Sequence, residues 1–261
     1  MEKQVKTVMP TLFVSHGAPN LVLQDLPVRA FLKQLASFAP RPRAILVVSA
    51  HWLTDEPTLD VSPRPETIHD FYGFEPELYD MRYDVPGAPQ LAEEIAETLL
   101  AAGFAPCTEM RGLDHGAWIP LVLAWPDARV PVTQLSLQPR RDAEHHYRLG
   151  LALSALRDDG VLVIGSGGAT HNLGALGSGT QLPDWAARFD RWLAERAEAG
   201  DADALTQYLT RAPDARRNHP TADHYLPLVV ALGAAGAKAR GTTIHESASN
   251  GSLSLRAFSF T

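Results

Sequence analysis

Histidine is the residue type in this sequence whose number and placement could do chemistry. The chain holds ten histidines and one cysteine. Neutral imidazole is a common metal ligand, and it exchanges protons near neutral pH. A single cysteine excludes an internal disulfide and a cysteine-based zinc site. The chemistry open to this chain therefore depends on where its histidines fall.

Three histidines come just after segments that read as buried strands. His16 follows "TLFVS", His51 follows "ILVVSA", and His171 comes a few residues after "VLVIGSGG". In α/β sheets the strand carboxyl ends share an edge, and ligands bind in the crevice outside it. Small residues frame all three histidines, which leaves room for backbone and metal to approach. We therefore expect these side chains to converge at one edge of a sheet.

Further histidines lie in segments that could reach the same edge. His115 stands in the glycine-flanked word "GLDHGAW", and "NHPTADHYLPL" places His219 in a loop and His224 in the first turn of a helix. A lone histidine of this kind is more often a hydrogen-bonded structural residue, but several in one α/β chain favour a shared metal site. The others are expected to be solvated in mid-helix (His145, His146), structural (His245), and either on a lid or on the surface (His69).

Other catalytic motifs are absent. Ser166 lies in "IGSGG", where the first glycine comes one place too late for the nucleophile elbow of hydrolases. "GSGGAT" ends in threonine and comes too late in the chain for a dinucleotide-binding fingerprint. Neither an H-E-x-x-H motif nor a phosphate-binding P-loop occurs. Metal chemistry through histidine is what remains.

Strand-like and helix-like segments alternate along the chain. We expect strands at 8–14, 45–50, 130–137 and 161–168, an edge strand at 251–260, and helices at 28–38, 89–102, 117–125, 142–160, 184–198, 201–210 and 223–236. Such alternation predicts an α/β fold with a central, mostly parallel (mixed) sheet, helices on both faces, and the metal site at the strand carboxyl edge. The proline-rich stretch 57–87 is expected to form a long excursion that lines the site.

Length, composition and charge limit the class of protein. The 261 residues, 45% of them hydrophobic, suffice for one large core, so we expect a single catalytic domain over residues 1–261. A net charge of -7 gives no electrostatic footprint for nucleic acid or an anionic membrane. No apolar run approaches the roughly 20 residues that span a bilayer. The N-terminal "MEKQVKTVMP" lacks the apolar core of a signal peptide. We therefore expect a cytoplasmic protein without nucleic-acid or membrane partners.

The histidine-bearing words, in this order, resemble the DODA-type extradiol aromatic ring-opening dioxygenases of the class III extradiol superfamily. They run from near residue 10 to residue 236, and together they are highly specific. The matching words are "PTLFVSHGAP", "RAILVVSAHW", "TIHDFYGFEPELYDMRYDVPG", "GLDHGAWIPL", "VPVTQLSL", "GSGGATHNL" and "HPTADHYLPL".

The resemblance implies roles for five histidines. By it, His16, His51 and His224 are metal ligands. His171 matches a histidine that is either a fourth ligand or the active-site base. His115 matches a catalytic histidine close to substrate and dioxygen. The usual non-haem iron site has two histidines and a carboxylate. If His224 occupies the carboxylate's place, the site is histidine-only and suits Zn(II) as well as Fe(II), although Fe(II) is expected for activity.

The implied reaction is extradiol cleavage of a catechol such as DOPA by O2, which gives a muconic semialdehyde. A zinc-binding hydrolase and a non-catalytic metal-binding relative are the alternatives on the same scaffold. Trp52, Tyr72 and His219 are expected to line the substrate pocket, because aromatic rings stack on a planar substrate and exclude water. Three carboxylates are expected to be metal ligands or partners of ligands: Asp114, Asp223 and Glu246. Three arginines are candidates to bind a carboxylate on the substrate: Arg111, Arg148 and Arg217.

Overall fold

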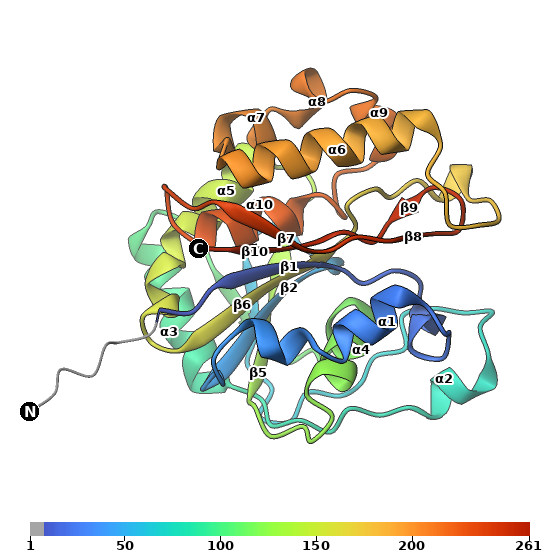
Figure 1. The fold of residues 1–261 in the computed structure, drawn as a ribbon. Helices are drawn as coiled ribbons and strands as arrows, with labels where there is room; N and C mark the ends of the chain where they lie inside the picture. Colours follow the sequence, from blue (N-terminus) through green and yellow to red (C-terminus); the bar gives the residue numbers. More distant parts are fainter. Residues whose placement is uncertain (1–7) are drawn as a thin grey trace, which may run out of the picture.

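A mixed eight-stranded sheet forms the centre of the structure (Figure 1). This computed structural model describes residues 8–261; residues 1–7, on which the expected lack of a signal peptide partly rests, lie outside the described part. The strands are β1 (Thr11–Ser15), β2 (Ala44–Leu53), β3 (Thr58–Asp60), β4 (Cys107–Glu109), β5 (Val132–Leu137), β6 (Val161–Gly167), β7 (Gly241–His245) and β10 (Ala257–Phe260), with a separate β8–β9 pair (Ala248–Ser249, Leu253–Ser254). Their order is β4-β3-β5-β2-β6-β1-β10-β7.

The four central strands are parallel, which confirms the predicted mostly parallel sheet. β5, β2, β6 and β1 pair in parallel, whereas β10 runs antiparallel to both β1 and β7. Their carboxyl ends therefore open on one side of the molecule, where the excursion after β3 and the loop after β6 also lie (Figure 1). Because neighbouring parallel strands cannot be joined by a tight hairpin, long crossover connections join these four strands.

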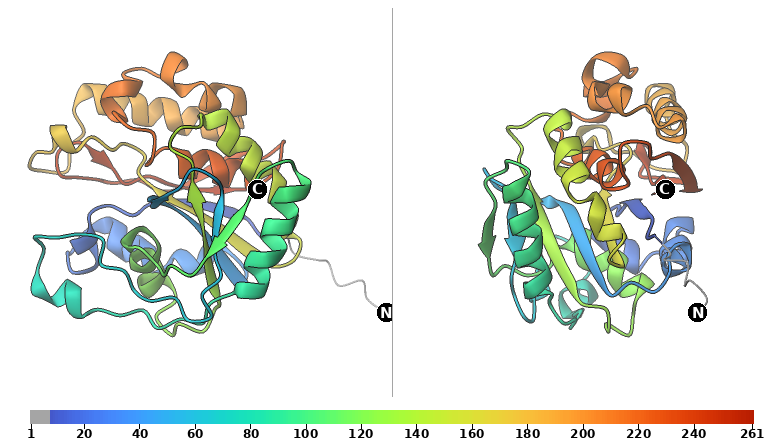
Figure 2. Two further views of the ribbon diagram at one scale, coloured as in Figure 1. Left: turned by 180° about the vertical axis from the view of Figure 1, so that it is seen from behind. Right: turned by 90° about the vertical axis from the view of Figure 1, so that its left-hand side faces the viewer.

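Helices cover both faces of the sheet, as predicted (Figure 2). Alternate residues of β2 explain how: Leu46 and Val48 join the core under α3, α5 and α10, whereas Ile45 and Val47 join the core under α1 and α4. No helix within residues 8–261 is long and apolar enough to cross a bilayer. The helices are α1 (Pro27–Leu32), α2 (Pro76–Asp80), α3 (Pro89–Ala101), α4 (His115–Ala124), α5 (Ala143–Ala152), α6 (Asp184–Ala199), α7 (Ala202–Thr206), α8 (Tyr208–Arg211), α9 (Ala215–Asn218) and α10 (Leu226–Ala234), with 3-10 turns at Pro19–Val22, Leu35–Phe38, Ser154–Arg157 and Leu173–Ala175.

Three expected boundaries were wrong. The C-terminal strand is not at the edge, because β7 pairs with the outer side of β10 and buries Phe258 and Phe260 completely. β2 does not end before His51 but continues to Leu53, so His51 is a strand residue. His224 lies in the turn before α10 rather than within its first turn, because α10 begins at Leu226 with Pro227 in its first positions.

The expectation of a solvated His146 was also wrong. The side chain is fully buried against β5, although Asp142 caps α5 as predicted. Its Nδ1–H donates to the Asp142 carbonyl (2.8 Å), and its Nε2 accepts the Gln138 N–H (3.1 Å). Burial lowers the pKa of His146 to about 4. The neutral ring is therefore a structural connector between α5 and the end of β5.

We expect His146 to make the fold less stable in mild acid. Below pH 6.5 this histidine binds a proton in the unfolded chain, whereas in the folded chain it binds one only below about pH 4. Stability therefore falls as the pH drops from 6.5 to 4, by about 2 kcal/mol at pH 5 from this residue alone. Urea unfolding at pH 7 and pH 5 should show a smaller loss for His146→Leu than for the wild type, and equal losses would contradict the assignment. His145→Leu, the same change on the half-buried neighbour whose pKa burial also lowers, should reduce the loss less than His146→Leu does.

Candidate metal centre

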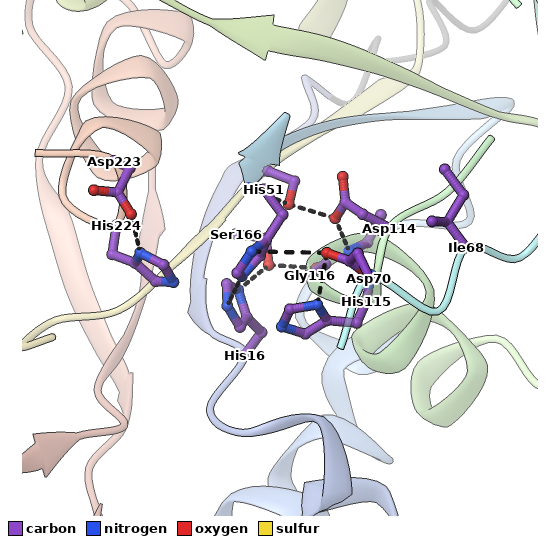
Figure 3. A network of polar contacts seen from close by, with 12 residues as sticks. His16, His51, Ile68, Asp70, Asp114, His115, Gly116, Ser166, Asp223 and His224 are labelled. Atoms are coloured by element: carbon purple, nitrogen blue, oxygen red, sulfur yellow. Dashed lines mark hydrogen bonds and ion pairs between the residues drawn. The ribbon is translucent and has the colours of Figure 1, made fainter. Parts of the chain in front are cut away.

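Histidines from four separate elements point toward one another at the carboxyl edge of the sheet (Figure 3). His16 follows β1, His51 lies near the end of β2, His115 begins α4, and His224 precedes α10. His171, in the loop after β6, stacks on His224. The structure thus brings together all five histidines that the sequence singles out for chemistry.

The rings of His16 and His51 are closest at their Nε2 atoms, which lie 3.0 Å apart. Ring centroids are 4.9 Å apart for His16 and His51, 5.0 Å for His51 and His224, and 5.3 Å for His16 and His224. His115 lies nearer to His51, at 3.9 Å, and 5.4 Å from His16. Donor nitrogens of His16, His51 and His115 lie within 4.8 Å of one another, so a histidine triad capable of metal binding is present.

Ser166 fixes the tautomer of His16. The Ser166 hydroxyl donates to the Gly116 carbonyl (2.5 Å), so its oxygen can only accept the hydrogen on Nδ1 of His16 (2.9 Å). Nε2 of His16 therefore carries a lone pair and no hydrogen. Burial and the neighbouring histidines also hold the pKa of His16 well below its usual value. A buried, neutral imidazole with its lone pair turned to the cluster is what a metal ligand requires.

A carboxylate holds each of the two outer histidines. Asp223 Oδ2 accepts from Nδ1 of His224 (2.5 Å), and Asp70 Oδ2 accepts from Nδ1 of His115 (2.9 Å). Burial raises the pKa of both carboxyl groups, but the hydrogen bonds and charge interactions with their histidines outweigh it. The pKa of Asp70 falls to about 2 and that of Asp223 lies well below its usual range. Both are ionised partners that leave Nε2 of each histidine facing the cluster.

His171 and His224 stack face to face, with centroids 3.4 Å apart and planes 3° from parallel. A group of His171, Asp223 and His224 also has its donor atoms within 4.8 Å. However, an imidazole lone pair lies in the plane of its ring, and parallel planes about one ring thickness apart do not meet at one ion. Burial, then repulsion from His224, lowers the pKa of His171 to about 3. The ring of His171 is thus neutral near pH 7 and lies against His224.

The backbone of His51 is held by a network centred on buried Asp114. Asp114 caps α4 by accepting from Ala117 N–H, and it also accepts from Ser49 Oγ (2.6 Å) and Arg111 Nη1 (3.0 Å). Ser49 Oγ accepts the His51 N–H (3.2 Å), while Arg111 donates to the His51 carbonyl (3.2 Å). Asp114 is therefore a structural residue that places His51 and the start of α4.

Two glycines let the histidine-bearing segments approach. A Cβ on Gly167 would lie 2.2 Å from the His224 carbonyl oxygen, and a Cβ on Gly116 would lie 2.5 Å from Ser49 Oγ and 3.1 Å from His51 Cδ2. The Gly167 carbonyl also accepts the His16 N–H (3.1 Å). The small residues expected to leave space for a metal thus make room mainly for neighbouring backbone and side chains.

The three residues predicted to line the pocket have different surroundings. Trp52 follows His51 in β2 and so points to the other face of the strand, with its ring under Arg111 at 4.9 Å. Tyr72 is 92% exposed. His219 is buried among aromatic rings, where its Nε2 donates to the Ala169 carbonyl (3.0 Å).

Of the remaining candidates, Asp223 contacts a site histidine, and Asp114 and Arg111 act through the network around His51. Glu246 pairs with Arg256 (3.2 Å) instead. Arg148 is exposed on α5, and Arg217 lies over Trp185.

Sequence reasoning missed Asp70 and the role of Ser166. Asp70 lies in the segment "TIHDFYGF", for which His69 and Tyr72, but not Asp70, were predicted to have a role. His69 itself packs against Trp118 and Tyr79 and contacts the Met81 carbonyl, so it anchors the excursion. The position of Asp70 depends on how a long loop folds back, a contact that no local pattern in the sequence specifies.

Comparisons with known proteins agree with this site. Residues 11–256 match the family described as the catalytic LigB subunit of aromatic ring-opening dioxygenase. A Beta vulgaris protein named 4,5-DOPA dioxygenase extradiol is 43% identical, over 97% of each chain. An Escherichia coli K12 protein of the same name is 38% identical, over 95% of this chain and 93% of the relative. A crystal structure of an uncharacterized E. coli K12 protein has a TM-score of 0.80 and 33% identity, over 96% of this chain and 99% of that one.

We expect Gly167→Ala to damage the site through the backbone of His224. The new methyl would clash with the His224 carbonyl, so the turn before α10 must move, at a cost of about 1–3 kcal/mol. Metal affinity should fall roughly 10–100-fold, because His224, which the sequence predicts as a ligand, loses its support. Isothermal titration with Fe(II) or Zn(II) measures this. Gly177→Ala, whose Cβ meets nothing within 4 Å, should bind metal normally, and an unchanged affinity in Gly167→Ala would overturn the reasoning.

Proposed function

Because this chain belongs to the family of catalytic LigB subunits of aromatic ring-opening dioxygenases, we propose that it cleaves a catechol such as DOPA next to its two hydroxyls. Its activity is that of an extradiol ring-opening oxidoreductase, with an aromatic ring and O2 as substrates. Both oxygen atoms enter the product, one in a carboxyl group and one in an aldehyde, which gives a muconic semialdehyde. An amine on the substrate side chain can then condense with that aldehyde. Relatives named as 4,5-DOPA dioxygenases support DOPA as the first substrate to test.

The ring geometry supports His16, His51 and His224 as the metal ligands. Two imidazoles on one ion, with bonds of about 2.0–2.1 Å and angles of about 90–115°, have nitrogens roughly 2.9–3.5 Å apart and centroids roughly 4.5–5.4 Å apart. The three centroid distances, 4.9, 5.0 and 5.3 Å, fall in this range, as does the 3.0 Å between the Nε2 atoms of His16 and His51. The centroids of His115 and His51 are 3.9 Å apart, below this range, so His224 fits an ion shared with His16 and His51 better than His115 does.

The donor set fits a divalent transition metal, and Fe(II) is the ion expected for activity. With the hydrogen of His16 on Nδ1, its Nε2 keeps a lone pair that can bind a cation, and Nε2 of His51 lies 3.0 Å away, at the spacing of two nitrogens on one ion. When bound, Fe(II) supplies open positions for catechol and O2 and lets electron density pass to triplet dioxygen. Zn(II) fits the same nitrogens and has no redox chemistry.

Two histidines outside this set move protons. His171 is neutral and stacked on His224 in a plane that excludes it from the same ion, so it accepts a proton from a catechol hydroxyl. His115 presents Nε2 on the other side of His16 and His51, where it handles the second proton of the reaction. The observation that carries the proposal is this division of the cluster into a metal-compatible triad flanked by two bases.

The reaction is tested by oxygen uptake. After anaerobic loading with Fe(II), L-DOPA and air should give one O2 consumed per catechol and a yellow product. Zn(II)-loaded protein is the control and should consume no oxygen, because zinc cannot pass electrons to O2. Absence of uptake with L-DOPA and with several other catechols would rule out the proposed function, and activity under Zn(II) with an ester substrate would favour a hydrolase.

The assignment of ligands is tested by metal content. His115→Phe should lower kcat by about 10²–10⁴-fold or more, since a proton carrier is lost, while the bound metal stays near one ion per chain. His224→Ala should lose most of its metal. If His115→Phe loses the metal and His224→Ala keeps it, His16, His51 and His115 are the ligands instead.

A further inference from the structure

Asp70 binds His115 twice, through the ring and through the backbone. Its Oδ2 accepts from Nδ1 of His115 and its Oδ1 accepts the His115 backbone N–H, both at 2.9 Å. We propose that Asp70 is a positioning residue that keeps the hydrogen of His115 on Nδ1 and so makes Nε2 the atom that handles protons in the reaction. This inference rests on the proposed function and deepens it.

The pair of bonds requires a carboxylate. His115 offers two donors to one side chain, and only a carboxylate has two oxygens that accept both. An asparagine has one acceptor and one NH2 group. With its oxygen on the backbone N–H, its NH2 would face Nδ1, which must then become an acceptor and send its hydrogen to Nε2. The ring would stay in place, but Nε2 would point a hydrogen at the substrate instead of a lone pair.

The excursion that carries Asp70 is fastened to the segment before α4. Backbone bonds join Ile68 N–H to the Leu113 carbonyl and Leu113 N–H to the Glu66 carbonyl, both at 2.8 Å. Trp118 Nε1–H donates to the Ile68 carbonyl (3.0 Å). Gly112 permits this close approach, since its φ is +121° and a Cβ would lie 2.7 Å from the Glu66 oxygen. These bonds hold the carboxylate in a fixed position relative to His115.

A comparison with Asp223 separates this role from metal binding. Asp223 also accepts from a histidine Nδ1, but its partner His224 belongs to the set that fits the metal. Asp70 lies 3.8 Å from Nδ1 of His51, beyond hydrogen-bond distance, and within residues 8–261 its hydrogen bonds go to His115. Loss of Asp223 should therefore show in metal content, and loss of Asp70 should show in the rate of turnover.

The test compares Asp70→Asn, Asp70→Ala and Asp223→Asn in the Fe(II)-loaded full chain, with Asp80→Asn as the matched control. Asp80 is an exposed acid on the same excursion, at the end of α2. We expect Asp70→Asn to lower kcat about 10²–10⁴-fold while KM changes less than roughly threefold, with one iron per chain retained. Asp223→Asn should lose iron, and Asp80→Asn should match the wild type in both.

Chemical rescue separates positioning from a merely structural role. The Asp70 side chain is 22% exposed, so a small anion can reach the space left in Asp70→Ala. Formate carries two acceptor oxygens and should raise kcat at least about tenfold over chloride at equal ionic strength. A kcat of Asp70→Asn within threefold of the wild type, iron loss in step with activity, or no gain with formate would each overturn the inference. Wild-type protein that consumes no oxygen with any catechol would instead count against the proposed function.

Discussion

The structure depends on gathering five imidazoles in one largely buried place at the carboxyl edge of the sheet. Burial and mutual repulsion keep His16, His51 and His171 from holding a second proton near neutral pH. Each ring must then have its single hydrogen placed by a partner, because a buried nitrogen without one is costly. Ser166, Asp70 and Asp223 provide such partners for His16, His115 and His224, whose Nε2 atoms face the cluster.

The backbone is arranged around this requirement. β6 passes between β1 and β2, so its glycine-rich end lies beside the segments that carry His16 and His51. Absence of a side chain at Gly167 lets the turn with His224 settle on the same strand, while Gly168 N–H donates to the His224 carbonyl (3.0 Å). The sheet therefore holds the cluster rigidly, and the turns and loops at its carboxyl edge orient the histidine rings toward one another.

Much of this was accessible from the sequence, for a definite reason. Parallel strands that end in histidine bring those residues to one edge, so the convergence of His16 and His51 follows from strand topology. The hydrogen-bond partners of His16 and His115 could not be predicted, because no local sequence pattern marks Ser166 or Asp70 as a partner of a distant histidine. The same limit explains the missed burial of His146, since the residues that cover it are known only after α5 packs on the sheet. The alternation of apolar and polar residues at 257–260 predicted an edge strand. Such alternation shows which face of a strand is buried, but it does not show which strands pair on either side.

The position of β1 has a consequence for the order of events in the cell. This strand carries His16, lies between β6 and β10, and so pairs with residues about 150 and 250 positions further along. Contacts of such sequence separation form late, because long loops must close first. During synthesis, residues 11–16 wait for their partners until residue 260 has left the ribosome. The segment that carries His16 is therefore fixed in place only after strands from the middle and the end of the sheet have been made.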